Sequence, residues 1–220
     1  MLVVELKPMK NSDFHHLERG MKRVLIIGSK GLLGSAIAKT LQTSHEVIEA
    51  SRSSQDHPVD ISKPDSLKAL FDKVRKIDAI ICTAGVANFQ SFSGATDDDW
   101  RFGLANKLMG QVNVVRYGTN HVNPNGCILL TTGVLANYPI QGSAIVTTVN
   151  AAVDGFVKSA ALELKGQVRI NAVSPGWITE TLAYLKMDTS LGLPANDVAK
   201  VYQQLLDSDA TGVIQIAAKG

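Results

Sequence analysis

The fold of this chain is decided by the stretch Arg23-Val-Leu-Ile-Ile-Gly28-Ser-Lys30-Gly31-Leu-Leu-Gly34-Ser-Ala-Ile-Ala38. Its first part, Val24 to Gly28, is a short apolar and β-branched run that is typical of a buried strand. Three glycines then follow at intervals of three residues, and the Ala- and Leu-rich run after them is typical of a helix. The sequence therefore predicts a strand, a tight turn and a helix in direct succession.

Each glycine of this turn meets a separate physical need. Gly28 lets the chain turn sharply, Gly31 lets backbone N–H groups approach a pyrophosphate, and Gly34 lets the helix pack closely on the strand. The unpaired N–H groups and the positive dipole end at the start of the helix attract phosphates. Many tight turns contain glycines at this spacing, so the strand-to-helix setting is what favours a dinucleotide site. The predicted site also includes the intervening residues Ser29, Lys30 and Leu33.

Composition restricts the class of protein. The chain has 220 residues, of which 45% are hydrophobic and 19% charged, so we expect one packed domain. The net charge of +2, without a basic block, argues against nucleic acid or a membrane surface as partner. We find no apolar run of membrane-spanning length and no secretory signal, and we expect a cytoplasmic location. Residues 1–20 have no clear period and are interpreted as an extension, poorly ordered or not native, ahead of a domain at 21–220.

The end of the second predicted strand, residues 45–50, carries information about the cofactor. In a dinucleotide fold, an acidic residue at this place binds the ribose 2′-hydroxyl of NAD, whereas a nearby arginine accommodates the 2′-phosphate of NADP. Here Ser51 takes the place of the acid and Arg52 follows it. Lys30 adds a second cation that we expect to reach the same phosphate. These residues favour NADP over NAD.

Strand and helix patterns alternate along the rest of the chain. We expect strands near 24–28, 45–50, 58–61, 77–82, 126–132, 167–173 and 212–217. We expect helices near 35–43, 64–74, 96–122 and 143–164, with further helices within 179–208 covering a substrate cleft. This alternation predicts a single α/β domain with a doubly wound, parallel, seven-stranded sheet.

Two local features have simple structural explanations. Cys82 falls late in one predicted strand and Cys127 early in the next, an offset of about four residues that exceeds the reach of a disulfide. The acidic run Asp97–Asp99 follows Thr96 and suits the first turn of a capped helix better than a metal site. We therefore expect free cysteines and no metal.

Motifs that cover nearly the whole chain carry a family resemblance. They are the glycine turn Gly28 to Gly34, Asp60-Ile61, Ala84-Gly85, Asp99-Trp100, Leu108-x-Gly110, Ala160 to Leu164, and Asn171-x-Val173-x-Pro175-Gly176-x-Ile178. From Met21 onward the chain resembles a short-chain dehydrogenase/reductase. The resemblance implies a Rossmann-type fold and an NADP-binding site. It places Asp60 and Ile61 at the adenine, and Pro175, Gly176 and Ile178 along the nicotinamide. It also implies a homodimer or homotetramer formed through the two long helices.

The catalytic residues of that family are missing. The family uses a serine, a tyrosine, a lysine four residues after the tyrosine, and an asparagine in the fourth helix. Alignment with these motifs puts Gly133 at the serine, Val146 at the tyrosine, Asn150 at the lysine and Lys107 at the asparagine. The lysine and the asparagine have thus exchanged places, which would keep one ammonium and one amide in the same small volume.

The exchange has two interpretations. In one, Asn150 hydrogen-bonds ribose hydroxyls and Lys107, desolvated near the nicotinamide, serves as an acid or as an anchor for a substrate oxyanion. In the other, Lys107 is an ordinary lysine on the surface of a helix, and Asn150 is a residue that the site tolerates and that has no catalytic role. Val146 cannot donate a proton, which leaves Thr132, Tyr138 and Tyr184 as the available hydroxyls.

Two functions of different classes follow from these residues. The first is an NADP(H)-dependent reductase that acts on a small-molecule substrate with an activated carbonyl or C=C bond, at a site organised by Lys107, Asn150 and Thr132. The second is a catalytically silent NADP-binding protein that senses the cofactor or acts through partners. Residues 134–142 and 179–195 would determine the substrate, and their sequence contains no recognisable code for it.

Overall fold

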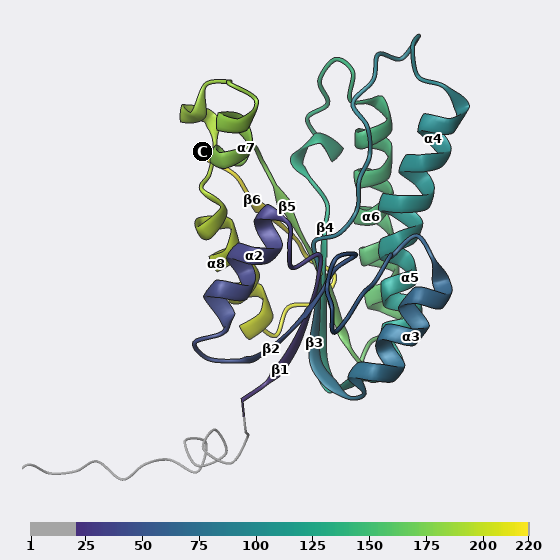
Figure 1. Cartoon of the computed structure of the whole chain (residues 1–220), viewed down its shortest axis with the longest axis vertical. Coiled ribbons are helices and arrows are strands. Elements are labelled where there is room, and N and C mark those ends of the chain that lie inside the picture. The colour runs from purple at the N-terminus through teal and green to yellow at the C-terminus, as the bar shows by residue number, and fades with distance from the viewer. Residues whose placement is uncertain (1–20, 220) are drawn as a thin grey trace, which may run out of the picture.

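A computed structural model describes residues 21–219 of the chain. These residues form one parallel sheet with helices on both faces (Figure 1). The strand order is β2-β1-β3-β4-β5-β6, which is the doubly wound arrangement expected from the alternating pattern. The predicted extension at 1–20 lies outside the described residues.

The elements follow the alternation that the sequence predicts. The strands are β1 (Arg23–Ile27), β2 (Glu46–Ala50), β3 (Ile77–Cys82), β4 (Val122–Thr131), β5 (Arg169–Pro175) and β6 (Ile214–Ala217). The helices are α2 (Leu32–Leu41), α3 (Pro64–Val74), α4 (Asp97–Gly103), α5 (Met109–Gly118), α6 (Ala144–Glu163), α7 (Thr179–Tyr184) and α8 (Ala195–Asp207).

Two apolar layers hold the helices to the sheet. Helices α2 and α8 cover one face, where Ile37 and Tyr202 belong to one buried cluster with Ile26 of strand β1. Helices α3, α5 and α6 cover the other face, where Phe71 and Val153 belong to a second buried cluster (Figure 1). Because all strands are parallel, their carboxyl ends meet at one edge of the sheet, and the loops from that edge build the site described below.

The sheet has six strands in the described residues, not the seven that we expected. The segment 58–61 is joined to strand β2 only by an isolated bridge between Ser51 and Pro58. Val59 N–H still donates to the Ser51 carbonyl, but Asp60 N–H donates to the Ser66 hydroxyl and not to a strand. Pro58 has no N–H to offer a ladder, and the chain turns away after one pairing.

The predicted helix over 96–122 is interrupted. It begins as α4, passes through a π-helical segment at Leu104–Leu108, and continues as α5. At its start, Thr96 and Asp99 form a reciprocal capping box, which confirms that the acidic run begins a helix. No cluster of three or more His, Cys, Asp or Glu able to hold a metal occurs within residues 21–219.

Helix α6 corrects one expectation from composition. By length and apolar content alone it is long enough to cross a membrane, whereas we expected no such segment. In the structure one side of the helix packs against the sheet, with Ile145, Val149 and Val157 fully or almost fully buried. This is the behaviour of a core helix.

Both cysteines are free, as predicted. Cys127 lies opposite Ala79 in the β3–β4 register, three residues before Cys82. This offset is one residue smaller than the sequence predicted, and it still corresponds to about 10 Å along the strands.

Candidate active site

The glycine turn has the close contacts that its sequence predicts. Gly28 has a φ of +96°, and a Cβ there would lie 2.7 Å from Thr83 Oγ1 and 2.8 Å from Ala84 N. A Cβ on Gly34 would lie 2.1 Å from the Gly28 carbonyl oxygen, so the helix could not pack this close with any other residue. Helix α2 starts after Gly31, and no side chain caps its first N–H groups. This backbone cradle fits the phosphates of a dinucleotide.

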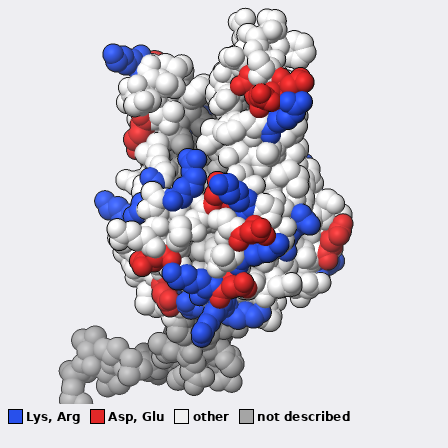
Figure 2. All heavy atoms as spheres, turned by 45° about the vertical axis from the view of Figure 1, so that its right-hand side comes forward, with Lys and Arg blue, Asp and Glu red and all other residues white. Residues whose placement is uncertain are grey.

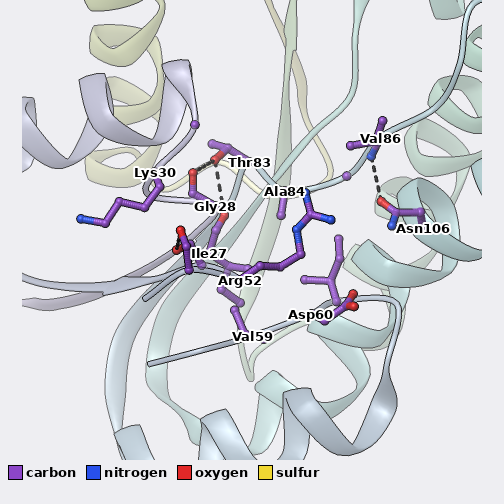
Figure 3. Close-up of a pocket in the computed structure, with 15 residues that line it drawn as sticks. Ile27, Gly28, Lys30, Arg52, Val59, Asp60, Thr83, Ala84, Val86 and Asn106 are labelled. Carbon is purple, nitrogen blue, oxygen red and sulfur yellow. Dashed lines mark hydrogen bonds between the residues drawn. The ribbon is translucent and has the colours of Figure 1, made fainter. Parts of the chain in front are cut away.

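A cavity of about 370 Å³ opens above this turn (Figure 3). Its walls come from the ends of β1, β2 and β3 and from the segment around Asp60. Nine predicted cofactor residues line it: Gly28, Lys30, Gly31, Ser51, Arg52, Asp60, Ile61, Ala84 and Gly85. The structure therefore brings together most of the residues that we assigned to the dinucleotide.

The two cations of this cavity point in different directions. Figure 3 shows Arg52 extending across the cavity, while Lys30 extends away from it. The Lys30 ammonium lies 3.9 Å from a carboxylate oxygen of Glu49, and both side chains are exposed. Arg52 thus extends into the cavity, whereas the Lys30 ammonium pairs with Glu49.

The adenine side of the cavity is held by hydrogen bonds and close packing. Asp60 accepts hydrogen bonds from the N–H (3.0 Å) and the hydroxyl (2.7 Å) of Ser62, and the hydroxyl bond is the main reason that its pKa is lowered. Ile61 packs against helix α5, where a Cβ on Gly110 would lie 2.7 Å from Ile61 Cδ1. The conformation of this segment therefore depends on its own hydroxyls and on a glycine in a neighbouring helix.

Four predicted cofactor residues do not line a cavity. The Ser29 hydroxyl is buried and donates to the Ala50 carbonyl at 3.3 Å, and Leu33 packs against the core on the α2 side. Gly34 acts through helix packing. Ile178 packs on the same core and bridges to Leu193, while its neighbours Pro175 and Gly176 line the second cavity described next. These four residues support the site through packing and backbone conformation in this structure.

A second cavity, of about 300 Å³, adjoins the first and shares Gly85 and Val86 with it. All three predicted catalytic residues line it: Lys107, Thr132 and Asn150. The remaining lining is mostly apolar and includes Ala87, Phe89, Val134, Leu135, Val146 and Trp177. Lys107 is the one charged residue in this lining. The two cavities together form an elongated site in which the three residues stand next to the dinucleotide-binding half.

Lys107 lies in the π-helical segment, and its side chain is partly buried. A Cβ on Gly85 would lie 3.4 Å from Lys107 Cγ and 3.5 Å from Cδ, so the stem of the lysine runs along this glycine. Burial lowers the pKa of Lys107 to about 8, although the Cys82 thiol and the Asp154 carboxyl act in the opposite direction. Lys107 is therefore not an ordinary surface lysine, and near neutral pH it can both hold and release a proton.

Gly133 and Asn150 form a matched pair. A Cβ on Gly133 would lie 2.9 Å from Asn150 Nδ2, so the amide occupies space that a side chain at 133 would need. Val146 lies one turn before Asn150 on helix α6, is almost fully buried and lines the same cavity. Neither Gly133 nor Val146 carries a hydroxyl, and the Asn150 amide is buried next to Gly133.

Thr132 points toward helix α6. Its hydroxyl is buried and lies beside the carboxyl of Asp154, to which it can donate a hydrogen bond. The neighbouring Thr131 points to the opposite face of the sheet, where its hydroxyl lies 2.7 Å from the hydroxyl of Tyr202. Thr132 is therefore the threonine of this strand end that belongs to the site.

Sequence reasoning missed two polar residues near the site. Asp154 stands one turn after Asn150 on α6 and is only 8% exposed. A carboxylate four residues after Asn150, on the core face of an apolar helix, was the signal that could have identified it. Asn106, beside Lys107, accepts a hydrogen bond from Val86 N–H at 2.9 Å and fixes the segment shared by the two cavities (Figure 3).

The two candidate tyrosines stand apart from both cavities. Tyr138 is 67% exposed and Tyr184 is 86% exposed, and neither is among the lining residues. In this structure they are surface side chains. The proton-bearing groups at the site are the Lys107 ammonium and the Thr132 hydroxyl.

The charged surface is mixed in sign. Figure 2 shows Lys and Arg side chains interspersed with Asp and Glu across this view, and a hollow between the two upper lobes of the molecule. This distribution agrees with a net charge of only +2.

Comparison with known proteins agrees with this architecture. The family model described as enoyl-(acyl carrier protein) reductase matches residues 32–213. The crystal structure of the protein lin1944 from Listeria innocua superposes with a TM-score of 0.85 at 36% identity, covering 89% of this chain and 99% of that one. A small-chain dehydrogenase crystallised with NADPH has a TM-score of 0.82, covers 90% of this chain and 97% of that one, and at 24% identity shares the fold.

Among curated proteins, a tetrahydroxynaphthalene reductase of Pestalotiopsis fici is 32% identical over 127 residues, which are 54% of this chain and 45% of that protein. A hydroxynaphthalene reductase of Aspergillus fumigatus is 24% identical over 64% of this chain and 54% of that protein. The chain thus matches about half the length of these two relatives. The family model, the parallel sheet with its glycine turn and these relatives agree, and the chain belongs to the short-chain dehydrogenase/reductase family of oxidoreductases.

Proposed function

We propose that this protein is an NADP(H)-dependent oxidoreductase in which Lys107 takes over the acid–base role that tyrosine has in its family. The observation that carries the proposal is the continuity of the two cavities through Gly85 and Val86. One cavity has the glycine cradle of a dinucleotide site, and the other contains the partly buried Lys107. A nicotinamide cofactor bound there would supply or accept a hydride.

The preference for NADP rests on Arg52 and Ser51. Arg52 reaches into the first cavity, and no carboxylate stands at position 51 to repel a 2′-phosphate (Figure 3). Relatives of the same fold have been crystallised with NADPH or NADP. A guanidinium can bind a phosphate through two parallel hydrogen bonds, which suits this role.

The acid–base role of Lys107 rests on its burial and its pKa. An ideal general acid has a pKa near the working pH, and burial brings the pKa of Lys107 to about 8. The protonated amine would donate to a carbonyl oxygen or to a developing carbanion, and Thr132 and Asn150 would orient the acceptor. The apolar walls of the cavity suit a small substrate with an activated carbonyl or C=C bond and an apolar body.

The test of this proposal is NADPH oxidation with a panel of activated ketones, quinones and enones. The wild-type protein and Lys107→Met should be compared, with Lys200→Met as a control on the exposed surface of helix α8. We expect turnover by the wild-type protein and the control, and loss of turnover in Lys107→Met. NADPH binding without oxidation across the panel would favour the alternative, a catalytically silent NADP-binding sensor or regulator.

We also propose a homodimer or homotetramer in the cytoplasm. The helices α4 to α6 carry the exposed apolar side chains Phe102, Leu104, Met109 and Leu162, which suit contact with a second copy. The two free cysteines suit a reducing compartment. Light scattering after size-exclusion chromatography tests the assembly, and a monomer would contradict it.

A further inference from the structure

Behind the second cavity lies an acidic residue whose burial calls for an explanation. Asp154 is on the core face of helix α6 and only 8% exposed, and its Oδ1 atom has no hydrogen-bond partner among residues 21–219. A carboxyl in such a place is costly unless another group compensates for it. Burial accordingly raises its pKa.

Two more acceptor oxygens near it are in the same condition. Thr132 Oγ1 and Asn150 Oδ1 are buried and unpartnered among the described residues. Both residues line the cavity together with Lys107. No hydrogen bond contributes to the pKa of Lys107, although an ammonium has three N–H groups to donate. The Thr132 hydroxyl lies beside the Asp154 carboxyl and can donate to it, which leaves acceptor capacity on Asp154, Thr132 and Asn150 on the side of the cavity that contains Lys107.

We propose that Asp154 is the buried counter-charge of Lys107 and that, with Thr132 and Asn150, it forms an acceptor cage that positions the lysine ammonium. The inference rests on the proposed function in that Lys107 is taken as the proton donor. Asp154 itself is a positioning residue, because it lies behind the cavity lining and acts through Lys107. No ion pair or hydrogen bond joins Lys107 to these three residues in this structure, so the cage reaches the ammonium through a bridging water.

The charges around the pair support this assignment. Lys107 faces the Cys82 thiol from strand β3 and the Asp154 carboxyl from α6. Burial raises the pKa of Cys82 to about 12, so the thiol is neutral and leaves Asp154 as the acid that faces Lys107 in the described part of the chain. Asp154 in turn faces Thr132 and, on its own helix, Lys158, which favours the ionised carboxylate.

The experiment is a pH titration of the full chain labelled with ¹³C-lysine, followed by NMR and without cofactor or substrate. Lys107→Met assigns the resonance. In Asp154→Asn we expect the pKa of Lys107 to fall by about one unit, because an opposite charge nearby is lost. Asp154→Glu should restore much of the shift, and Asp97→Asn, a surface aspartate of α4, should leave it unchanged.

Thr132→Val provides a second variant if Asp154→Asn does not fold. It removes one acceptor and keeps the carboxyl, and we expect a smaller fall in the same direction. If the pKa of Lys107 is unchanged in Asp154→Asn, the inference is overturned. If only Thr132→Val folds, an unchanged pKa in that variant overturns it. The titration does not depend on turnover. A protein that turns over no substrate but shows the expected pKa shift would reject the proposed function and still support Asp154 as the counter-charge of Lys107.

Discussion

The two halves of the site are built in different ways. The dinucleotide half is made mostly of backbone, where a Cβ on Gly28 or Gly34 would collide with other backbone atoms. The reacting half is made of side chains, namely Lys107, Thr132 and Asn150, around a cavity with apolar walls. A backbone cradle cannot change without disturbing the fold, whereas side chains around a cavity can be exchanged as a set. Under the proposed function, this difference lets the dinucleotide half keep the glycine turn while the reacting half uses Lys107.

The largest expected effect separates chemistry from binding. Lys107→Met should lower turnover by about 10² to 10⁴, the usual contribution of a positioned general acid. The thermal stabilisation by NADPH should persist, because the dinucleotide cavity keeps its own lining. Steady-state kinetics and thermal unfolding of the same samples provide the measurement. A variant that turns over like the wild-type protein would remove Lys107 from the chemistry.

The backbone half should respond to the smallest substitution. Gly34→Ala places a Cβ 2.1 Å from the Gly28 carbonyl oxygen, and we expect a loss of about 3 kcal/mol in the free energy of unfolding together with weaker NADPH binding. The matched control is Gly155→Ala, where nothing lies within 4 Å of the added methyl group. That control should be neutral or stabilising by about 0.5–1 kcal/mol, since alanine favours a helix. Equal urea midpoints for the two variants would contradict the steric account.

Substitution of Arg52 tests which side chain distinguishes NADPH from NADH. Arg52→Ala should weaken NADPH by about 10- to 100-fold and leave NADH nearly unchanged, because only NADPH carries the 2′-phosphate. Lys30→Ala should have a smaller effect, since the Lys30 side chain extends away from the cavity and its ammonium lies near Glu49 (Figure 3). Isothermal titration with both cofactors measures the difference. A larger loss in Lys30→Ala than in Arg52→Ala would reverse the assignment.

The pH profile sharpens the role of the lysine. Only the protonated amine donates, and its pKa of about 8 lies below that of a free lysine. Reductase turnover should therefore be constant below pH 8 and fall by about tenfold per pH unit above it. Kinetics between pH 6 and pH 10 test this. A rate that rises through pH 8 would indicate that Lys107 acts as a base in the reductive direction.

The smallest effect concerns the pair Gly133 and Asn150. Gly133→Ala forces a methyl group to within 2.9 Å of Asn150 Nδ2 and should destabilise the fold by about 1 kcal/mol. In the background of Asn150→Ala the same change should cost almost nothing, because the amide is gone. A double-mutant cycle by urea unfolding measures this coupling. Additive effects would show that the two positions do not share space.

The sequence predicted the dinucleotide half of the molecule better than the reacting half. The turn from Gly28 to Gly34 and the alternation of strands and helices depend on local patterns, and the sequence predicted both together with the parallel, doubly wound sheet. The segment 58–61 was expected as a strand, but after its one bridge to Ser51 the Asp60 N–H donates to the Ser66 hydroxyl and not to a strand. The π-helical segment at 104–108 leaves no trace in hydrophobic periodicity.

The sequence predicted which residues form the candidate site, but not how buried each residue is or which atoms surround it. Alignment placed Lys107 and Asn150 at one site. The burial of the lysine and the unpartnered oxygens of Thr132 and Asp154 cannot be predicted from the spacing of residues in the sequence. The direction of Lys30 depends on its contact with Glu49 across the exposed end of β2. Such properties arise from tertiary contacts between elements distant in sequence.

The most direct test of the central claim, an intact NADP site beside an altered reacting cavity, is thermal unfolding with NADPH and, separately, with NADH, for the wild-type protein and Lys107→Met. At 100 times its dissociation constant, a ligand adds about 2.7 kcal/mol to the free energy of unfolding. We predict a clear upward shift with NADPH in both proteins and little shift with NADH. The absence of a shift with either cofactor in the wild-type protein would contradict the account.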